Sequence, residues 1–261
     1  MTRIPVVPNR ELGQHFLVDE NILHVAGRLG ELDDQDVVLE VGAGLGVLTE
    51  FLAARVAHVH AIELDRALEP HLRERLAGRQ NVELVFGDAL ALPLGSLDPA
   101  PTKLVANLPY QVATPVVVES LDGLPTVELW CVMVQREVAD RLFGVPGTKA
   151  YGAVSVLVQL TAERTGFHPV ARTCFRPPPN VDSALVAFRR RRHWGPEYAR
   201  LKEIVQAAFA HRRKTLANSL ALSGIERTHV TRAVAAMKLR EDVRAERLSP
   251  EEFVRLAELL S

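Results

Sequence analysis

A short polar motif near the middle of the chain has the residue types needed for chemistry on an amine. Asn107-Leu108-Pro109-Tyr110 joins a carboxamide, a backbone carbonyl, a rigid proline and an aromatic ring. The exocyclic amine of a nucleobase is a poor nucleophile, because its lone pair is delocalised into the ring. The Asn107 side-chain oxygen and the Leu108 carbonyl can accept its two N–H groups and free that lone pair for in-line attack on a sulfonium methyl. Tyr110 can stack on the base.

The residues of a nucleoside pocket lie in three separate turns that precede this motif in the chain. Each of these turns follows an apolar run. The first turn, Gly42-Ala43-Gly44-Leu45-Gly46, lets the backbone bend tightly and lets a ligand approach it closely. Glu63 ends the second run and can accept both hydroxyls of a ribose. Asp88 follows the third run and can accept a hydrogen bond from an adenine amine.

The glycine turn differs from the one that binds dinucleotides. A dinucleotide fingerprint has a further glycine at the position where this chain has Val47. The three turns together therefore predict an adenosine pocket without a pyrophosphate site, and S-adenosylmethionine fits that description.

The elements that must position these motifs alternate between strand and helix. Their apolar runs suit strands covered on both faces, which favours an α/β fold with a doubly wound, Rossmann-like sheet that binds its ligand at the carboxyl ends of the strands. We expect strands over Val37–Val41, Val56–Glu63, Val82–Phe86, Lys103–Ala106 and Leu129–Val134, near Arg164–Phe167, and over Ala184–Phe188. Helices are expected over Leu48–Arg55, Ala67–Leu76 and Pro115–Leu121.

The composition changes at the run Arg189-Arg190-Arg191-Arg192, which predicts a domain boundary. We expect a Rossmann-like methyltransferase domain over residues 1–190 and a small all-α domain over 191–261. The helices expected in the second domain are Tyr198–His211, Arg213–Leu222, Thr228–Met237 and Pro250–Leu260.

Charge separates the two parts of the chain. Residues 189–261 contain 16 Lys and Arg against nine Asp and Glu, a net charge of +7, although the whole chain has a net charge of -1. A basic segment on an acidic body predicts a polyanionic partner, with Arg212, Arg213 and Lys214 as its RNA contacts. The alternatives are a solvated arginine-rich helix surface, or arginines that pack the two domains together.

Composition and terminal sequence exclude several other classes. The chain has 261 residues, 48% hydrophobic and 24% charged, which is typical of globular proteins. The opening MTRIPVVPNR has no apolar core of a signal peptide, and no apolar run approaches the roughly 18 residues of a membrane span. Two cysteines without a CxxC pair and nine scattered histidines predict neither a disulfide nor a metal site, and the expected compartment is the cytoplasm.

These motifs together resemble the rRNA adenine N6-methyltransferases, and among them the dimethyladenosine transferases of small-subunit (16S) rRNA. The resemblance covers nearly the whole chain, and its motifs are specific only as a set. They are Leu12–Leu17, Val41–Thr49, Glu63, Gly87–Ala89, Asn107–Tyr110, Val134–Arg141, Ala150–Gly152, Phe175–Ala184 and His211–Leu216.

The resemblance implies a reaction and a set of site residues. It implies N6,N6-dimethylation of two adjacent adenosines in the 3'-terminal hairpin loop of 16S rRNA within the immature 30S subunit. Nothing in the sequence demands more than a monomer, which is the expected oligomeric state. The residues it places around S-adenosylmethionine are His15, Leu17, Gly42, Glu63, Asp88 and Asn107, with His15 where Asn is common. The residues it places at the reacting base are Asn107, Leu108, Tyr110 and Phe175, the last two on opposite sides of a flipped adenine.

Two other readings remain open. The erythromycin-resistance group, which methylates large-subunit rRNA, shares the fold and the glycine turn, but tends toward Asn-Ile-Pro and Pro-Val-Pro. Here Asn107-Leu108-Pro109-Tyr110 and Pro177-Pro178-Pro179 favour the small-subunit group. The second reading is a ribosome-assembly factor that acts mainly by binding, although the intact Asn107 and acidic pocket favour an enzyme.

Overall fold

The chain forms two compact units. The computed structural model describes residues 6–9 and 11–260. One unit contains the described residues up to 139 together with 163–190, and the other contains residues 140–162 together with the described residues from 191 onward. The chain therefore enters the second unit, returns to the first, and enters the second again.

The first unit is built on a seven-stranded sheet with the order β4-β3-β2-β5-β6-β9-β7. The strands β2 to β6 run parallel to one another, so the carboxyl ends of β2 to β5 meet at one edge. Their bounds are β2 Val37–Val41, β3 His58–Glu63, β4 Val82–Phe86, β5 Lys103–Asn107, β6 Leu129–Gln135, β7 Ala162–Val170 and β9 Ser183–Arg190.

The strand β9 departs from the expected parallel sheet, because it runs antiparallel to β6. It lies between β6 and β7 and is buried along nearly its whole length, so its apolar run looks like that of a parallel strand. Trp130 and Phe188 are register partners on β6 and β9, and their rings stack with centroids 5.2 Å apart.

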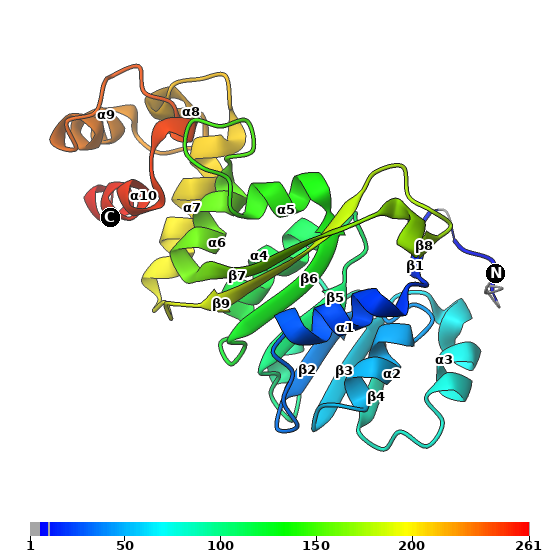
Figure 1. Cartoon of the computed structure of the whole chain (residues 1–261). Coiled ribbons are helices and arrows are strands. Elements are labelled where there is room, and N and C mark those ends of the chain that lie inside the picture. Colours follow the sequence, from blue (N-terminus) through cyan, green and yellow to red (C-terminus); the bar gives the residue numbers. More distant parts are fainter. Residues whose placement is uncertain (1–5, 10, 261) are drawn as a thin grey trace. The chain divides into compact units, whose positions relative to one another are not determined.

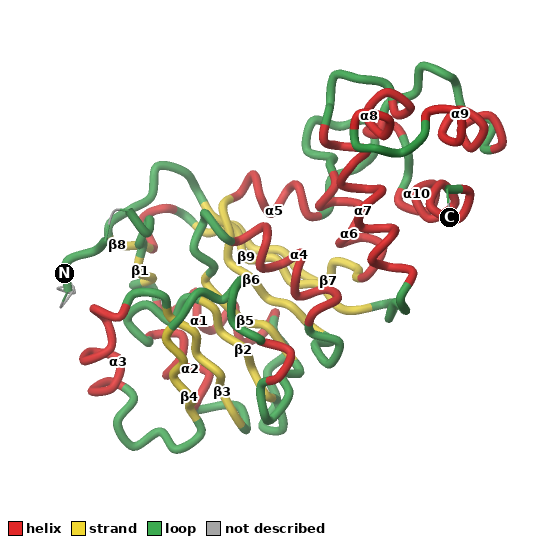
Figure 2. The backbone as a smooth tube through the Cα atoms, turned by 180° about the vertical axis from the view of Figure 1, so that it is seen from behind, coloured by secondary structure: helices red, strands yellow, loops and turns green. Residues whose placement is uncertain are grey.

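Helices cover both faces of this sheet. Figure 1 shows α1 and α2 in front of the strands, and the view from behind in Figure 2 shows α4 on the opposite face. A second, two-stranded sheet pairs β1 with β8, which the sequence did not predict. The bounds are α1 Glu20–Leu29, α2 Val47–Ala53, α3 Glu69–Arg75, α4 Ala113–Gly123, α5 Arg136–Leu142, β1 Phe16–Leu17 and β8 Phe175–Arg176, with 3-10 turns at Arg66–Leu68, Leu94–Ser96 and Arg172–Cys174.

The second unit is helical. Its helices are α6 Ala153–Thr161, α7 Glu197–Ala210, α8 Leu216–Leu222, α9 Arg227–Ala236 and α10 Pro250–Leu259, with a 3-10 turn at Ala245–Arg247. The sequence assigns residues 140–162 to the first domain, whereas α6 packs its apolar face against α7 and α10. The Tyr151 hydroxyl donates to the Leu248 carbonyl at 2.7 Å, and Phe209 contacts the rings of both Tyr151 and Phe253.

Local capping sets where these helices begin. Ser249 and Glu252 form a capping box at the start of α10, each side chain accepting the other's backbone N–H at 3.2 and 2.7 Å. Helix α8 begins at Leu216, because the Thr215 side chain accepts the N–H of Asn218. The expected start at residue 213 is therefore wrong by one turn.

Among the helices of the described residues, none combines the length and the apolar composition needed to span a membrane.

One of the four arginines in the run 189–192 is a core residue. Arg190 is 7% exposed, and its guanidinium donates to the carbonyls of Val127, Leu121 and Leu124 at 2.8, 2.9 and 3.0 Å. Its charge also lies 4.9 Å from the ring of Trp130. The planar guanidinium group, with several donors in fixed directions, suits these carbonyls, which lie at the C-terminal end of α4 and in the turn that follows it.

We predict that Arg190→Lys lowers the free energy of unfolding by about 2–3 kcal/mol, because a single ammonium cannot reach three separated carbonyls. Urea unfolding checks this. Arg191→Lys, which changes a half-exposed residue paired with Glu251 at 3.7 Å, is the matched control and should have an effect within about 0.5 kcal/mol. Equal effects of the two substitutions would contradict the assigned role.

Candidate functional site

A cavity that opens to solvent lies at the carboxyl ends of β2 to β5. It contains every site residue expected from the sequence in this unit except Leu17. Leu17 is the register partner of Phe175 between β1 and β8, and its side chain is buried in the hydrophobic core. The lining residues are 12–16, 41, 42, 44, 62–64, 87–89, 107–112 and 175.

The glycine turn after β2 is fitted closely to the motif after β5. Gly42 has φ +85°, and a Cβ at this position would lie 2.9 Å from Cδ of Pro109. Gly44 and Gly46 also have positive φ, and Gly46 precedes the first residue of α2. Only glycine allows this backbone and this contact without strain, so the turn brings the end of β2 directly against the polar motif.

Glu63 at the end of β3 connects two of the turns. One oxygen of its carboxylate accepts the N–H of Gly44 at 2.7 Å, and the other accepts the N–H of Asp65 at 2.8 Å. The side chain is 6% exposed, and burial raises its pKa, which these two hydrogen bonds partly oppose. The carboxylate therefore lies at the cavity wall with its orientation fixed.

Asp88 follows β4 at the same edge. Its Oδ1 accepts the N–H of Leu90 at 2.9 Å, which stabilises the turn and leaves the rest of the carboxylate exposed at the cavity. The backbone N–H of Gly87 donates to the Glu63 carbonyl at 2.9 Å. The two acids therefore belong to neighbouring turns whose spacing is set by the sheet.

The polar motif presents two hydrogen-bond acceptors at the cavity. The Leu108 N–H donates to the Met133 carbonyl at 3.1 Å, which fixes the peptide after β5. Within the described ranges, neither the Asn107 carboxamide nor the Leu108 carbonyl has a hydrogen-bond partner. The Tyr110 hydroxyl lies 2.7 Å from Oγ of Ser183 on β9, so its ring is held in place.

The segment around the proline run contacts the N-terminal motif. His15 Nδ1 donates to the Pro177 carbonyl at 2.8 Å, and the His15 ring lies 5.7 Å from the ring of Tyr110. Phe175 lines the cavity, is fully buried, and packs in the core with Phe16. The structure thus brings Phe175 and Tyr110 to one cavity, with Phe175 also acting as a core residue.

Gln14 has a role that sequence reasoning did not assign. Its amide donates to Oδ2 of Asp65 at 2.8 Å, and its Oε1 accepts the N–H of Asn9 at 2.7 Å. It therefore ties the N-terminal segment to the turn that follows β3. The motif Leu12–Leu17 was the available signal, although it does not say which of its residues points at which turn.

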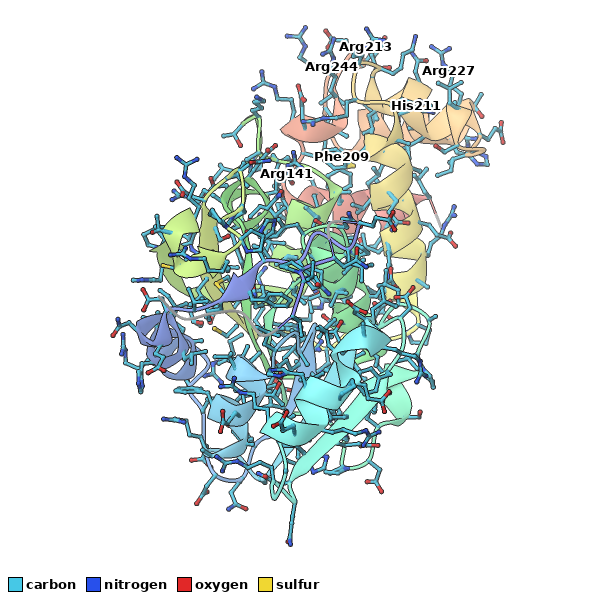
Figure 3. All side chains as sticks on the ribbon, turned by 90° about the vertical axis from the view of Figure 1, so that its right-hand side faces the viewer. Arg141, Phe209, His211, Arg213, Arg227 and Arg244 are labelled. Atoms are coloured by element: carbon cyan, nitrogen blue, oxygen red, sulfur yellow. The ribbon has the colours of Figure 1, made fainter. Side chains whose placement is uncertain are left out.

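The three expected RNA contacts lie in the helical unit. Arg212, Arg213 and Lys214 are exposed in the turn between α7 and α8, and not at the start of a helix. Arg212 donates to the Lys149 carbonyl at 3.5 Å, whereas Arg213 and Lys214 form no ion pair with any residue that the structure describes. Figure 3 shows Arg213, Arg227 and Arg244 extending outward from this unit.

A doubly wound sheet with an acidic cavity at its strand ends is the arrangement by which Rossmann-like folds bind nucleosides and nucleotides. Comparison with known proteins gives the family. The family model described as ribosomal RNA adenine dimethylase matches residues 8–261. The chain belongs to the ribosomal RNA adenine dimethylase family.

Individual relatives extend over nearly the full chain. Ribosomal RNA small subunit methyltransferase A from Rubrobacter xylanophilus is 44% identical over 97% of this chain and 95% of its own length. The protein of the same name from Lactiplantibacillus plantarum is 42% identical over 96% of this chain and 89% of its own.

Among solved structures, the 23S rRNA methyltransferase ErmE matches with a TM-score of 0.68 and 30% identity over 94% of this chain and 99% of its own. A dimethyladenosine transferase from Plasmodium falciparum has the same fold, with a TM-score of 0.75 and 23% identity over 93% of this chain and 96% of its own.

A second carboxyl, that of Glu40, is buried close enough to Glu63 to interact with its charge. Glu40 on β2 is 1% exposed, and its Oε2 has no hydrogen-bond partner among the described residues. Burial, reinforced by the charge of Glu63, raises the pKa of Glu40 from 4.5 to about 8. Glu40 is therefore mainly protonated at neutral pH.

We predict that Glu40 makes the fold less stable as pH rises from about 4.5 to about 8. In that interval the folded chain holds a proton that the unfolded chain has lost, so the free energy of unfolding falls with pH. Glu40→Gln removes this contribution and should flatten the fall. Urea unfolding at a series of pH values, with exposed Glu74→Gln as control, measures it. The same slope in Glu40→Gln and in the parent would contradict the buried neutral carboxyl.

Proposed function

We propose that this chain dimethylates small-subunit rRNA, using S-adenosylmethionine to convert two adjacent adenosines of the 3'-terminal hairpin loop of 16S rRNA to N6,N6-dimethyladenosine. The observation that supports this is the joining, in one cavity, of the acidic strand ends and the Asn107–Tyr110 motif. The proposed substrate form is the immature 30S subunit in the cytoplasm, and the proposed enzyme is a monomer.

The acidic wall fits the adenosine part of the cofactor. Glu63 is oriented by two backbone N–H groups and retains acceptor capacity for the hydroxyls of a ribose. One oxygen of the Asp88 carboxylate accepts the N–H of Leu90, and the carboxylate can still accept a hydrogen bond from the adenine amine. Gly42 lets the ligand approach the backbone. S-adenosylmethionine supplies an electrophilic sulfonium methyl when it is bound.

The polar motif fits the base that receives the methyl group. In the proposed reaction the Asn107 carboxamide oxygen and the Leu108 carbonyl accept the two N–H groups of adenine N6 and direct its lone pair at the methyl carbon. The same acceptors stabilise the positive charge that develops on nitrogen before a proton is lost to water. Tyr110, held by Ser183, offers a stacking surface for a base that has left its helix.

Large-subunit rRNA is the second candidate substrate, because the sequence is 30% identical to that of the 23S rRNA methyltransferase ErmE over nearly the full length of both chains. The higher identity to proteins named small subunit methyltransferase A favours the small subunit. Transfer of tritiated methyl groups to unmethylated 30S particles, compared with 50S precursors, separates the two. Label in 30S rRNA alone supports the proposal, and label in 50S precursors alone would overturn it.

We predict that Glu63→Ala and Asp88→Ala each weaken S-adenosylmethionine binding by about 1.5–3 kcal/mol, because each removes a hydrogen bond to a charged group. Calorimetric titration measures the change, and Glu74→Ala, which changes an exposed acid outside the cavity, is the control. Circular dichroism confirms that the variants are folded. Unchanged affinity in both cavity variants would remove the assignment of this wall to the cofactor.

We predict that Asn107→Ala slows methyl transfer about 100-fold or more and leaves affinity for 30S particles unchanged, since the carboxamide acts on the nucleophile. Single-turnover rates at saturating RNA measure this effect. Asn180→Ala, at an exposed position outside the cavity, is the matched control. A parental rate in Asn107→Ala would rule out the proposed role.

We predict that Arg212→Ala combined with Arg213→Ala weakens binding to 30S particles and reduces the salt dependence of that binding by up to roughly two phosphate contacts. Binding curves over a salt series measure the slope. Arg255→Ala, whose exposed guanidinium pairs with Glu258 at 3.0 Å, is the control. An unchanged salt dependence of binding, together with lowered thermal stability, would show that these arginines pack against the rest of the protein and do not contact RNA.

A further inference from the structure

Two histidines and a glutamate come together on β3 and β4, outside the cavity. His58 and His60 are two residues apart on β3, so their side chains project from the same face of the sheet. Glu83 on β4 is the register partner of His60, which places its carboxylate on that face as well. None of the three lines the cavity, which lies at the other end of β3.

The hydrogen bonds of His60 define which of its nitrogens carries a proton. Nε2 lies 2.8 Å from the Pro99 carbonyl oxygen. A carbonyl oxygen only accepts, so Nε2 carries a hydrogen and donates it. In the neutral ring, Nδ1 then has no hydrogen and presents a lone pair. This atom lies 2.8 Å from Oε2 of Glu83. Two lone pairs at that distance require a metal cation or a proton between them.

His58 supplies a third atom at the same place. Its Nε2 is buried without a hydrogen-bond partner among the described residues and lies 4.0 Å from the same Oε2 of Glu83. One ligand atom from each of the three residues lies within 4.8 Å of the ligand atoms of the other two.

We propose that His58 Nε2, His60 Nδ1 and the Glu83 carboxylate bind a divalent transition-metal ion, with Zn²⁺ as the expected ion. Two imidazole nitrogens and one carboxylate oxygen form a common zinc ligand set that leaves a fourth position for water. Bonds of about 2.0–2.2 Å place the ligands of one tetrahedral ion roughly 3.3 Å apart, and the spacings of 2.8 and 4.0 Å lie on either side of this value.

The surroundings complete the site in two ways. The Nε2–H of His60 donates to a backbone carbonyl, as the second nitrogen of a metal-bound histidine usually does. His60 is fully buried while Glu83 is half-exposed on the edge strand β4, so an ion can enter from solvent. A bound ion would link β3, β4 and, through Pro99, the loop that precedes β5.

The test uses the full-length chain, freed of metal by dialysis against a chelator and titrated with Zn²⁺ in competition with a chromophoric indicator. We expect one tight ion per chain, and at least about tenfold weaker binding in His58→Ala and in Glu83→Gln. Titration with Co²⁺ adds visible absorption bands of four-coordinate geometry in the parent and not in the variants.

The matched control is His229→Ala, which changes an exposed histidine that lies 3.4 Å from Glu226 and has no third potential ligand in the described part of the chain. It should bind Zn²⁺ as the parent does. A cation-free alternative, in which His60 carries both protons and forms an ion pair with Glu83, predicts no tight ion. Absence of binding by the parent, or equal affinity in His58→Ala, Glu83→Gln and His229→Ala, would overturn the proposal.

Discussion

The carboxylate of Glu63 is the constraint on which the cavity depends, because it joins the turn after β2 to the turn after β3. Burying a carboxylate is unfavourable, and the raised pKa of Glu63 reflects that cost. Backbone N–H groups of Gly44 and Asp65 offset it at 2.7 and 2.8 Å. The same two contacts hold the acid at the cavity wall, so the arrangement of the two turns and the proposed ribose contact rely on one side chain.

The other parts of the site follow from this junction. Gly42 lets the first turn approach Pro109, which brings the Asn107 carboxamide to the same cavity. Asp65, whose backbone is held by Glu63, receives the amide of Gln14 and thereby fixes the N-terminal segment. Four stretches of chain that are distant in sequence thus meet at one edge of the sheet, as ligand sites in doubly wound folds do.

The sequence predicted the central strands well, because buried parallel strands are continuous apolar runs. The expected bounds Val37–Val41 and Val82–Phe86 are those of β2 and β4, whereas β3 begins at His58 and not at Val56. The two-residue strands β1 and β8 are too short to leave a periodic pattern. The membership of α6 in the helical unit depends on packing against α7 and α10, which local sequence does not report.

Site residues were predictable where a turn motif names them and not where pairing between strands decides. The glycine turn, Glu63, Asp88 and the Asn107 motif all reach the cavity. Leu17 does not, because its side chain is buried in the hydrophobic core. The group of His58, His60 and Glu83 was missed, because only the register of β3 and β4 brings the glutamate beside the histidines.

The most direct test of the account is a crystal structure of the chain with S-adenosylhomocysteine, the product left after methyl transfer. We expect the ribose hydroxyls within hydrogen-bond distance of Glu63, the adenine amine at Asp88, and the sulfur facing the Asn107 side of the cavity. A ligand bound with its ribose away from Glu63, or outside this cavity, would contradict the account.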